Sequence, residues 1–405
     1  MKGQRVGPNE TALKLPVRRR PVRIGFIGCG MVAKVGHGPA ARADGRAVIA
    51  ACADPDDRNR ERFARRYQVP SAFRDHREML DREDLDAVVI ATPPWLHADH
   101  VEDAASRGVA ILCEKPMAGT VEDCDRIVAS RDRHGVLLQM GHSKRFEAGF
   151  QRIKEWIAEG RLGRVHQMSV CWHYYIPDFT KNPAKLVIDK AKAWFNLDLL
   201  KEWGSWRMLD ARAGGGDFFD HGPHYLDLAR FLLGEIESIS AETNNLVPSR
   251  LSEDQAVATL RLKTGCLVVL EKSNQVIGRP TGFEVGYLYA DQAKVRFECE
   301  QEYKLKPMKV WRYGLYNIPL DLWTPTRAPW GKTGTLYFRQ MRHFLDRLTG
   351  EETLKRGFAG PWAATAEDAR EAVIWTKAAY RSAEQGVKVK RADLPLETSA
   401  SGPGV

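Results

Sequence analysis

Short apolar runs alternate with amphipathic segments over the first part of the chain, from Pro21 to about Gly141. The apolar runs predict strands buried in a parallel sheet at Val22–Gly28, Ala47–Ala53, Asp86–Ala91, Val109–Cys113 and Val136–Met140. The segments between them predict helices that end near Tyr67, run through His97–Arg107 and cover Val121–His134. Regular alternation of strand and helix is typical of a doubly wound α/β sheet, which we expect over residues 21–145.

The pattern changes after Arg145. Apolar and polar residues alternate with a period of two, which predicts strands at Ile236–Thr243, Ala256–Lys263, Cys266–Asn274, Phe283–Ala290 and Lys294–Glu300. Helices are predicted over Phe150–Glu159, Leu336–Leu348 and Ala364–Glu384, and Thr264-Gly265 predicts a hairpin turn. We therefore expect a second, α+β domain over residues 146–395 with a large, mostly antiparallel sheet. A basic arm (residues 1–20) and a tail (396–405) complete the chain.

Composition adds mainly exclusions. The chain has 405 residues, of which 43% are hydrophobic and 28% charged, as in soluble proteins of two domains. No apolar stretch reaches the roughly 18 residues of a membrane helix, and the basic arm lacks the apolar core of a secretory signal. The seven cysteines contain no C-x-x-C pair, so neither a disulfide framework nor a zinc site is expected. The net charge of +9 accompanies no nucleic-acid-binding motif, so we expect a cytoplasmic protein without nucleic-acid or membrane partners.

A glycine turn between the first strand and its helix indicates a dinucleotide site. Gly28-Cys29-Gly30-Met31-Val32-Ala33 matches G-x-G-x-x-A, in which glycines admit a pyrophosphate to the helix N-terminus. Asp54 follows the second strand, where a carboxylate binds the adenosine ribose and repels a 2′-phosphate. This favours NAD, although Arg58 and Arg60 lie close by. Alternatively, Asp54 caps the next helix.

Two further motifs carry polar side chains that could act on a substrate. Glu114-Lys115-Pro116 follows a predicted strand at its carboxyl end, where α/β sheets bind ligands, although Lys115 could equally be a solvated loop residue. Gly214-Gly215-Gly216 precedes Asp220 and His224, which an unbroken helix would place on one face. A histidine beside a carboxylate can accept a proton near neutral pH.

Two other interpretations of the second motif remain. One is a helix cap with a surface histidine. The other is a metal site formed by four side chains, namely Asp220, His221, His224 and Asp227, although their spacing matches no metal motif. We expect no metal.

Together these motifs resemble the glucose–fructose oxidoreductase/inositol dehydrogenase (Gfo/Idh/MocA) family, from Val22 to about Val389. The resemblance also rests on Ala91-Thr92-Pro93-Pro94 with His97, on Trp206-Arg207, and on Ser382-Ala383 with Gly386. It implies that Lys115, Asp220 and His224 form the catalytic centre. The cofactor-binding residues it implies are Gly28, Gly30, Met31, Val32, Asp54, Thr92, Pro93, Pro94, His97, Glu114 and Lys115. Lys144 is a departure, because the family often has an asparagine before the arginine at 145.

The substrate side is less determined. The candidate substrate-binding residues are Lys115, Arg145, Trp172, Tyr174, Trp206, Asp220, His221 and His224. The stretch from Trp172 to Arg212 is rich in aromatic residues, which suit the C–H faces of a sugar but equally suit core packing or a subunit contact.

The resemblance implies an NAD-dependent dehydrogenase that oxidises a secondary hydroxyl of a sugar, glycoside or cyclic polyol. His224 would be the base, and Lys115 would stabilise the substrate oxygen. Pro93, Pro94 and His97 would border the nicotinamide. Some relatives hydrolyse glycosides with NAD and no net oxidation, which is the alternative, and a cofactor-sensing protein without turnover is a third possibility. An uncovered sheet face in the second domain predicts a homo-oligomer, either a dimer or a tetramer.

Overall fold

The computed structural model describes residues 20–173, 210–247, 250–274, 283–300, 304–305, 308–312, 321–323, 335–350 and 362–394. The tail, and all of the basic arm except Arg20, lie outside these ranges. So do the predicted substrate residues Tyr174 and Trp206 and most of the aromatic stretch around them.

Six parallel strands form the first sheet, in the order β3-β2-β1-β4-β5-β6. The strands are β1 (Val22–Ile27), β2 (Ala47–Ala53), β3 (Ser71–Phe73), β4 (Ala87–Ile90), β5 (Ala110–Cys113) and β6 (Leu138–Met140). The helices between them are η1 (Ala33–His37), α1 (Gly38–Ala43), α2 (Asp57–Tyr67), α3 (His76–Arg82), η2 (Pro94–Leu96), α4 (His97–Ala105) and α5 (Val121–His134). The expected doubly wound sheet is confirmed. Its strand order reverses between β1 and β4, which opens a crevice at their carboxyl ends.

The second sheet is mostly antiparallel, as expected, and follows the order β15-β14-β12-β11-β7-β10-β9-β8-β16, with β13 paired to β12. Its longer strands are β7 (Val165–His173), β8 (Ile236–Asn244), β9 (Gln255–Leu262), β10 (Leu267–Ser273), β11 (Phe283–Ala290) and β12 (Ala293–Glu300). The shorter ones are β13 (Lys304–Leu305), β14 (Met308–Arg312), β15 (Asp321–Trp323) and β16 (Val389–Lys390). The pair β7–β10 is parallel. Gly265, at φ +84°, makes the predicted turn between β9 and β10.

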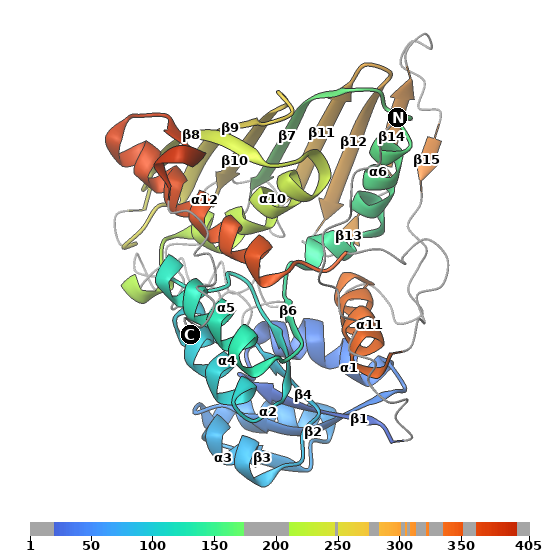
Figure 1. The fold of residues 1–405 in the computed structure, drawn as a ribbon, viewed down its shortest axis with the longest axis vertical. Helices are drawn as coiled ribbons and strands as arrows, with labels where there is room; N and C mark the ends of the chain where they lie inside the picture. Colours follow the sequence, from blue (N-terminus) through green and yellow to red (C-terminus); the bar gives the residue numbers. More distant parts are fainter. Residues whose placement is uncertain are drawn as a thin grey trace, which may run out of the picture.

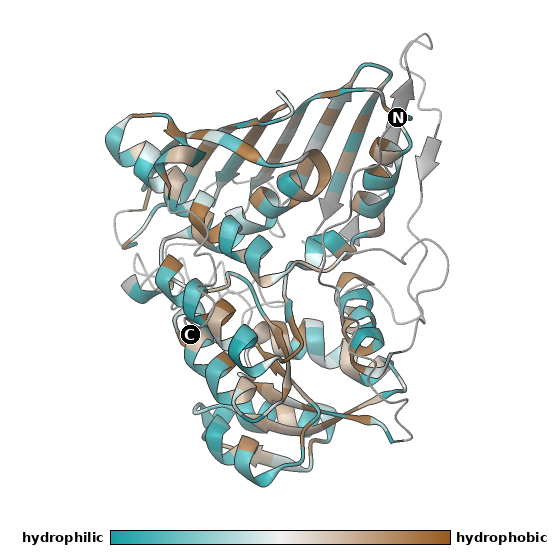
Figure 2. Cartoon of the chain, in the orientation of Figure 1, coloured by the Kyte–Doolittle hydropathy of each residue, from teal (hydrophilic) through white to brown (hydrophobic). Residues whose placement is uncertain are grey.

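Helices cover one face of this sheet (Figure 1). They are α6 (Ala148–Ala158), α10 (Asp217–Leu233) and α12 (Ala366–Gln385). The strands alternate accordingly: Ala258 and Leu260 of β9 are buried beneath the helices, whereas Val257 and Thr259, which each precede one of them, are exposed. The same alternation appears as brown and teal bands along the strands (Figure 2). Every second side chain of a strand lies on the buried face of the sheet. This requirement sets the register in which the strands pair.

One helix of the late sequence returns to the first sheet. Leu336, Met341 and Phe344 of α11 (Thr335–Thr349) pack in one core with Phe26 and Leu112, and α11 lies beside α1 (Figure 1). Residues 146–395 were expected to form one domain, so this packing is a departure from that division. Sequence pattern finds the apolar stripe of a helix but does not say which sheet it covers.

In the described part of the chain, no helix is both long and apolar enough to cross a membrane.

Candidate active site

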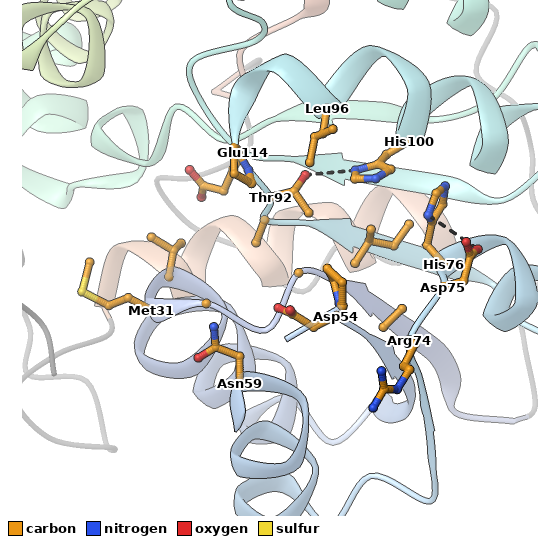
Figure 3. A pocket seen from close by; sticks show the side chains of 18 of the residues that line it. Met31, Asp54, Asn59, Arg74, Asp75, His76, Thr92, Leu96, His100 and Glu114 are labelled. Carbon is orange, nitrogen blue, oxygen red and sulfur yellow. Dashed lines mark hydrogen bonds and ion pairs between the residues drawn. The ribbon is translucent and has the colours of Figure 1, made fainter. Parts of the chain in front are cut away.

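A cavity of about 530 Å³ opens at the carboxyl ends of the first sheet (Figure 3). Most of the predicted cofactor residues line it, namely Gly28, Gly30, Met31, Val32, Asp54, Thr92, Pro93, Glu114 and Lys115. They come from the ends of β1, β2, β4 and β5, the four strands that meet at the crevice. Strand order thus gathers residues that are far apart in the sequence.

The glycine turn leaves room for a cofactor. Gly28 has φ +89°, and a Cβ there would lie 2.8 Å from the carbonyl oxygen of Ala91, so the turn requires glycine. A Cβ on Gly30 would meet nothing within 4 Å. The backbone is therefore open to a ligand at the start of η1, as a pyrophosphate would need.

Asp54 faces this turn. Its Oδ2 accepts the N–H of Cys29 at 2.7 Å and its Oδ1 accepts that of Asp56 at 2.9 Å. The cap of α2 is Asp56, which accepts the N–H of Asn59, so the alternative of Asp54 as the helix cap is wrong. Burial raises the pKa of Asp54, against the two N–H donors. The carboxylate is oriented by the glycine turn and lies on the cavity wall.

Several residues of this wall belong to none of the sequence motifs. His76 and His100 lie edge to face with ring centroids 4.3 Å apart, and His100 Nδ1 shares a hydrogen bond of 3.0 Å with Thr92 Oγ1 (Figure 3). Burial and the charge of His76 lower the pKa of His100 to about 3, so this ring stays neutral. Asn59 and Arg74 also line the wall. The short β3, which leads to Arg74 and His76, lacks a clear periodic signal.

The carboxylate of Glu114 is fixed by two hydrogen bonds. His37 Nε2 donates to its Oε1 at 2.6 Å, and its Oε2 accepts the N–H of Lys115 at 3.1 Å. Burial raises the pKa of Glu114, but the hydrogen bond and charge of His37 outweigh burial and leave that pKa lowered. An ionised Glu114 therefore fixes the backbone from which Lys115 extends.

Lys115 connects the cavity to α10. Its Nζ donates to the backbone oxygen of Asp220 at 3.0 Å and to Asp220 Oδ1 at 3.2 Å. His224 lies one turn further along the same helix, because α10 is unbroken across Pro223. The Asp220 and Lys115 side chains are 9% and 12% exposed, so their interaction is little screened by water.

His224 is partly exposed, and its Nδ1 is buried without a hydrogen-bond partner in the described part of the chain. Burial, followed by the charges of Lys115 and Lys144, lowers its pKa well below the ordinary value of 6.5. The edge of the His142 ring faces it, at 6.4 Å between centroids. A neutral imidazole with an unpaired nitrogen is suited to accept a proton.

Two family models match the chain. The Gfo/Idh/MocA oxidoreductase model, described as an NAD-binding Rossmann fold, matches residues 22–142, and the C-terminal domain model of the same family matches residues 150–287. The chain belongs to the Gfo/Idh/MocA family. It is thus an oxidoreductase with an NAD-binding domain.

Relatives within this family extend the comparison. Myo-inositol 2-dehydrogenase of Thermotoga maritima is 27% identical over 67% of this chain and 76% of the relative. D-apiose dehydrogenase of Paraburkholderia graminis is 26% identical over 94% and 93%. The WlbA dehydrogenase of Bordetella pertussis, solved with NADH and UDP-GlcNAcA, superposes with a TM-score of 0.71 at 22% identity, over 94% of this chain and 100% of that one. The first two of these relatives are, by their names, dehydrogenases of a cyclitol and of a sugar.

Two of the cofactor-binding residues that the family resemblance implies do not line the cavity. The His97 ring is wholly buried, with Nε2 2.8 Å from the carbonyl oxygen of Thr92 and Nδ1 3.1 Å from that of Pro116. His97 therefore joins the loops after β4 and β5 and does not line the cavity. Pro94 is also buried and is not among the residues that line the cavity.

Arg145 and Trp172 are also structural, contrary to the expectation that they bind substrate. Arg145 makes a two-pronged ion pair with Asp227, at 2.8 and 2.6 Å, in which both side chains are buried. Trp172 is wholly buried and stacks on Tyr225 with ring centroids 4.4 Å apart. For Trp172, core packing is therefore the correct alternative.

Lys144, the departure from the family pattern, pairs with Glu284 at 2.6 Å and lies over the Tyr225 ring. Two of the four side chains of the alternative metal site are already paired with cations: Asp220 pairs with Lys115, and Asp227 pairs with Arg145. The one group of metal-ligand type within the described ranges is Cys171, His173 and Glu271, on β7 and β10, and it involves none of these side chains.

Proposed function

We propose that the protein is an NAD-dependent dehydrogenase that oxidises a secondary hydroxyl of a sugar, glycoside or cyclic polyol. One observation carries the proposal: Lys115 lines the cavity, and its ammonium group contacts Asp220, one helical turn from a neutral His224. The names of the relatives support the substrate class.

The cofactor, when bound, accepts hydride at its nicotinamide. His224 takes the hydroxyl proton at its ring nitrogen, and its lowered pKa keeps that nitrogen free. Lys115 donates to the same substrate oxygen and stabilises the charge that develops there. Asp220 holds the ammonium group of Lys115 in place, and His221, the remaining candidate, is described below. The residues that would hold the cofactor are Gly28, Gly30, Met31, Val32, Asp54, Thr92, Pro93 and Glu114.

A panel of sugars, glycosides and cyclitols tests this function. Purified protein is incubated with NAD and each compound, NADH is followed by absorbance, and products are identified by mass spectrometry. The proposal expects NADH and a ketone or lactone in equal amounts from at least one compound. An aglycone released without NADH would indicate the glycosidase alternative. Absence of both, in protein that binds NAD, would overturn the proposal.

Two broader properties belong to the same proposal. We propose that the enzyme is a homo-oligomer, because its second sheet has helices on one face. We also place it in the cytoplasm, since the six cysteines whose side chains the structure describes are unpaired, as in a reducing compartment.

A further inference from the structure

Five charged or titratable side chains form a continuous buried row from the second sheet to the cavity. In order they are Lys272, Asp217, His221, Asp220 and Lys115, which we name the charge ladder. Lys272 Nζ lies 2.5 Å from Asp217 Oδ2. His221 Nδ1 lies 3.2 Å from Asp217 Oδ1 and 3.6 Å from Asp220 Oδ2. The row ends with the contact of 3.2 Å between Asp220 Oδ1 and Lys115 Nζ.

The two ends of the ladder serve different purposes. Lys115 and Asp220 belong to the proposed catalytic centre, whereas Lys272 extends from the carboxyl end of β10 and its side chain is 0% exposed. A buried ammonium group and a buried carboxylate cost free energy to desolvate, and an apolar pair of similar size is often as stable. Stability alone therefore gives little reason for Lys272 and Asp217 to be charged.

The surroundings of His221 determine which of its nitrogens carries a proton. The atoms near Nδ1 are the backbone oxygen of Asp217 at 3.3 Å and the two carboxylate oxygens, all of which are acceptors. Nδ1 therefore carries hydrogen, and Nε2 is the nitrogen that titrates. His221 sits between the two carboxylates as a donor.

We propose that His221 is a positioning residue, which orients Asp220 toward Lys115, and that Asp217 and Lys272 serve to hold His221 neutral in that place. The proposal rests on the function proposed above and goes beyond the Lys115, Asp220 and His224 centre. Asp217 supplies an acceptor for Nδ1, and Lys272 neutralises the charge that Asp217 would otherwise exert on the imidazole. An uncharged His221 does not compete with the Lys115 ammonium group for the Asp220 carboxylate.

Other charged groups surround this part of α10. On the helix itself there is His224. The described elements packed against it carry Lys144 on η3 (Ser143–Phe146), His142 just before η3, Glu253 before β9, and Lys377 and Tyr380 on α12. Glu253 accepts the N–H groups of Gly216 and Phe218 and is bonded to Tyr380. These groups are the same in every variant below, so differences between variants report the ladder.

Lys272→Met removes one charge from the far end of the ladder. Asp217 then lacks its cation, and the Asp217–His221 pair takes up a proton at higher pH than in the natural protein. The added positive charge draws Asp220 from Lys115. In a plot of kcat against pH, the acid limb is the range in which kcat falls as the pH is lowered. We expect this limb to move upward by about one pH unit. Lys272→Met/Asp217→Asn removes both charges and should return the limb to its original place.

Arg370→Met is the matched control. Arg370 is a buried cation that pairs with Asp125 at 2.5 Å, on α12 and α5, and takes no part in the ladder. Its loss should lower the melting temperature and leave the acid limb in place. If Lys272→Met, folded and binding NAD, behaves like Arg370→Met, the ladder has only a structural role and the proposal is overturned.

A second pair of variants covers the case in which Lys272→Met does not fold. His221→Asn retains an N–H donor near the position of Nδ1, whereas His221→Phe has none. We expect His221→Phe to lose about tenfold in kcat with an unchanged KM for NAD, the size seen for other supporting side chains, and His221→Asn to restore most of it. Equal losses in the two variants would contradict a positioning role.

Histidine titration by NMR separates this inference from the proposed function, because it needs no substrate. The His221 signal is assigned by its disappearance in His221→Asn, and its pKa should rise in Lys272→Met. A panel that finds no substrate would sink the proposed function and leave this titration intact. An active enzyme in which the His221 pKa does not respond to Lys272→Met would sink the ladder alone.

Discussion

The proposed chemistry depends on two side chains, Lys115 from the loop after β5, which lines the cavity, and His224 from α10, whose pKa is lowered in part by the charge of Lys115. We expect His224→Ala to lower kcat by roughly 10²–10⁴, the usual effect of losing a general base, while NAD still binds. The lowered pKa of His224 places the acid limb of the kcat profile below pH 6.5, because the base loses function only when protonated. His224→Ala should abolish this limb, as measured by initial rates from acid to neutral pH.

Lys115→Ala should act differently, because it removes a donor to the substrate oxygen. We expect a loss of roughly 10²–10³ in kcat, by analogy with a lost oxyanion donor. The double variant should lose less than the product of the single losses, since both residues act on one oxygen. Near-normal turnover with an unchanged acid limb in His224→Ala would instead make Asp220 or neutral Lys115 the base.

Asp54 should determine the choice of cofactor. Its carboxylate lies on the cavity wall beside the glycine turn, where a 2′-phosphate would meet a like charge. We expect kcat/KM to be higher with NAD than with NADP, and Asp54→Asn to narrow the difference. Equal values in the unaltered protein would mean that nearby cations, such as Arg58 or Arg60, override the carboxylate.

Single residues also show what sequence motifs can and cannot predict. The motifs placed Gly28, Asp54 and Lys115 on the cavity wall, because each follows a strand whose end faces the crevice. They misplaced Arg145, whose direction is decided by Asp227, 82 residues later in the chain. A motif gives a backbone position, whereas the partner that turns a side chain inward comes from a distant element.

Whole elements were more predictable than side-chain directions. Ala47–Ala53, Val121–His134 and Phe283–Ala290 agree with the structure at both ends, since their period and end signals coincide. No strand was predicted at β7, although the buried Met168, Val170 and Trp172 occupy every second position along it. The short β3 and β13 carry too few residues for a period to be visible.

The start of α6 provides a prediction about stability. Glu147 is its N-cap residue, yet its side chain makes no capping bond, and its Oε1 is buried without a partner in the described structure. Burial raises the pKa of Glu147 from 4.5 to about 7. The protonated form is thus favoured on folding, so this group stabilises the protein fully below pH 4.5 and ceases to do so as pH rises through 7.

Glu147→Gln should remove that dependence. Relative to the natural protein, we expect the variant to gain about 1–3 kcal/mol in free energy of unfolding at pH 8 and much less at pH 5. Denaturant unfolding at both pH values measures the difference. Glu159→Gln, at the exposed end of the same helix, is the control and should show no such gain. A gain that is equal at the two pH values would contradict the buried, protonated Glu147.

At the scale of the molecule, the chain crosses between its two sheets more than once. It leaves the first sheet after β6, builds the second, and returns through α11 to cover the first again. Both sheets could be predicted from the sequence because each has its own pattern. The strands of the first sheet are continuous apolar runs, and those of the second alternate between apolar and polar residues. The sequence did not predict the return, since an apolar helix face fits either sheet and only the folded core distinguishes them.

The second sheet leads to the last prediction. Among the described residues, α6, α10 and α12 pack on one face (Figure 1), while the other face carries Val257 and Leu267, 41% and 44% exposed. Apolar side chains on an uncovered sheet face favour association with a second copy. We expect light scattering at micromolar concentration to give at least twice the chain mass of 45.6 kDa. Val257→Asp/Leu267→Asp should shift the protein toward the single chain, whereas Leu251→Asp, in an exposed loop off the sheet, should not. A mass of one chain in the natural protein would contradict the prediction, because it would show that the apolar side chains of this face stay exposed to water without driving association.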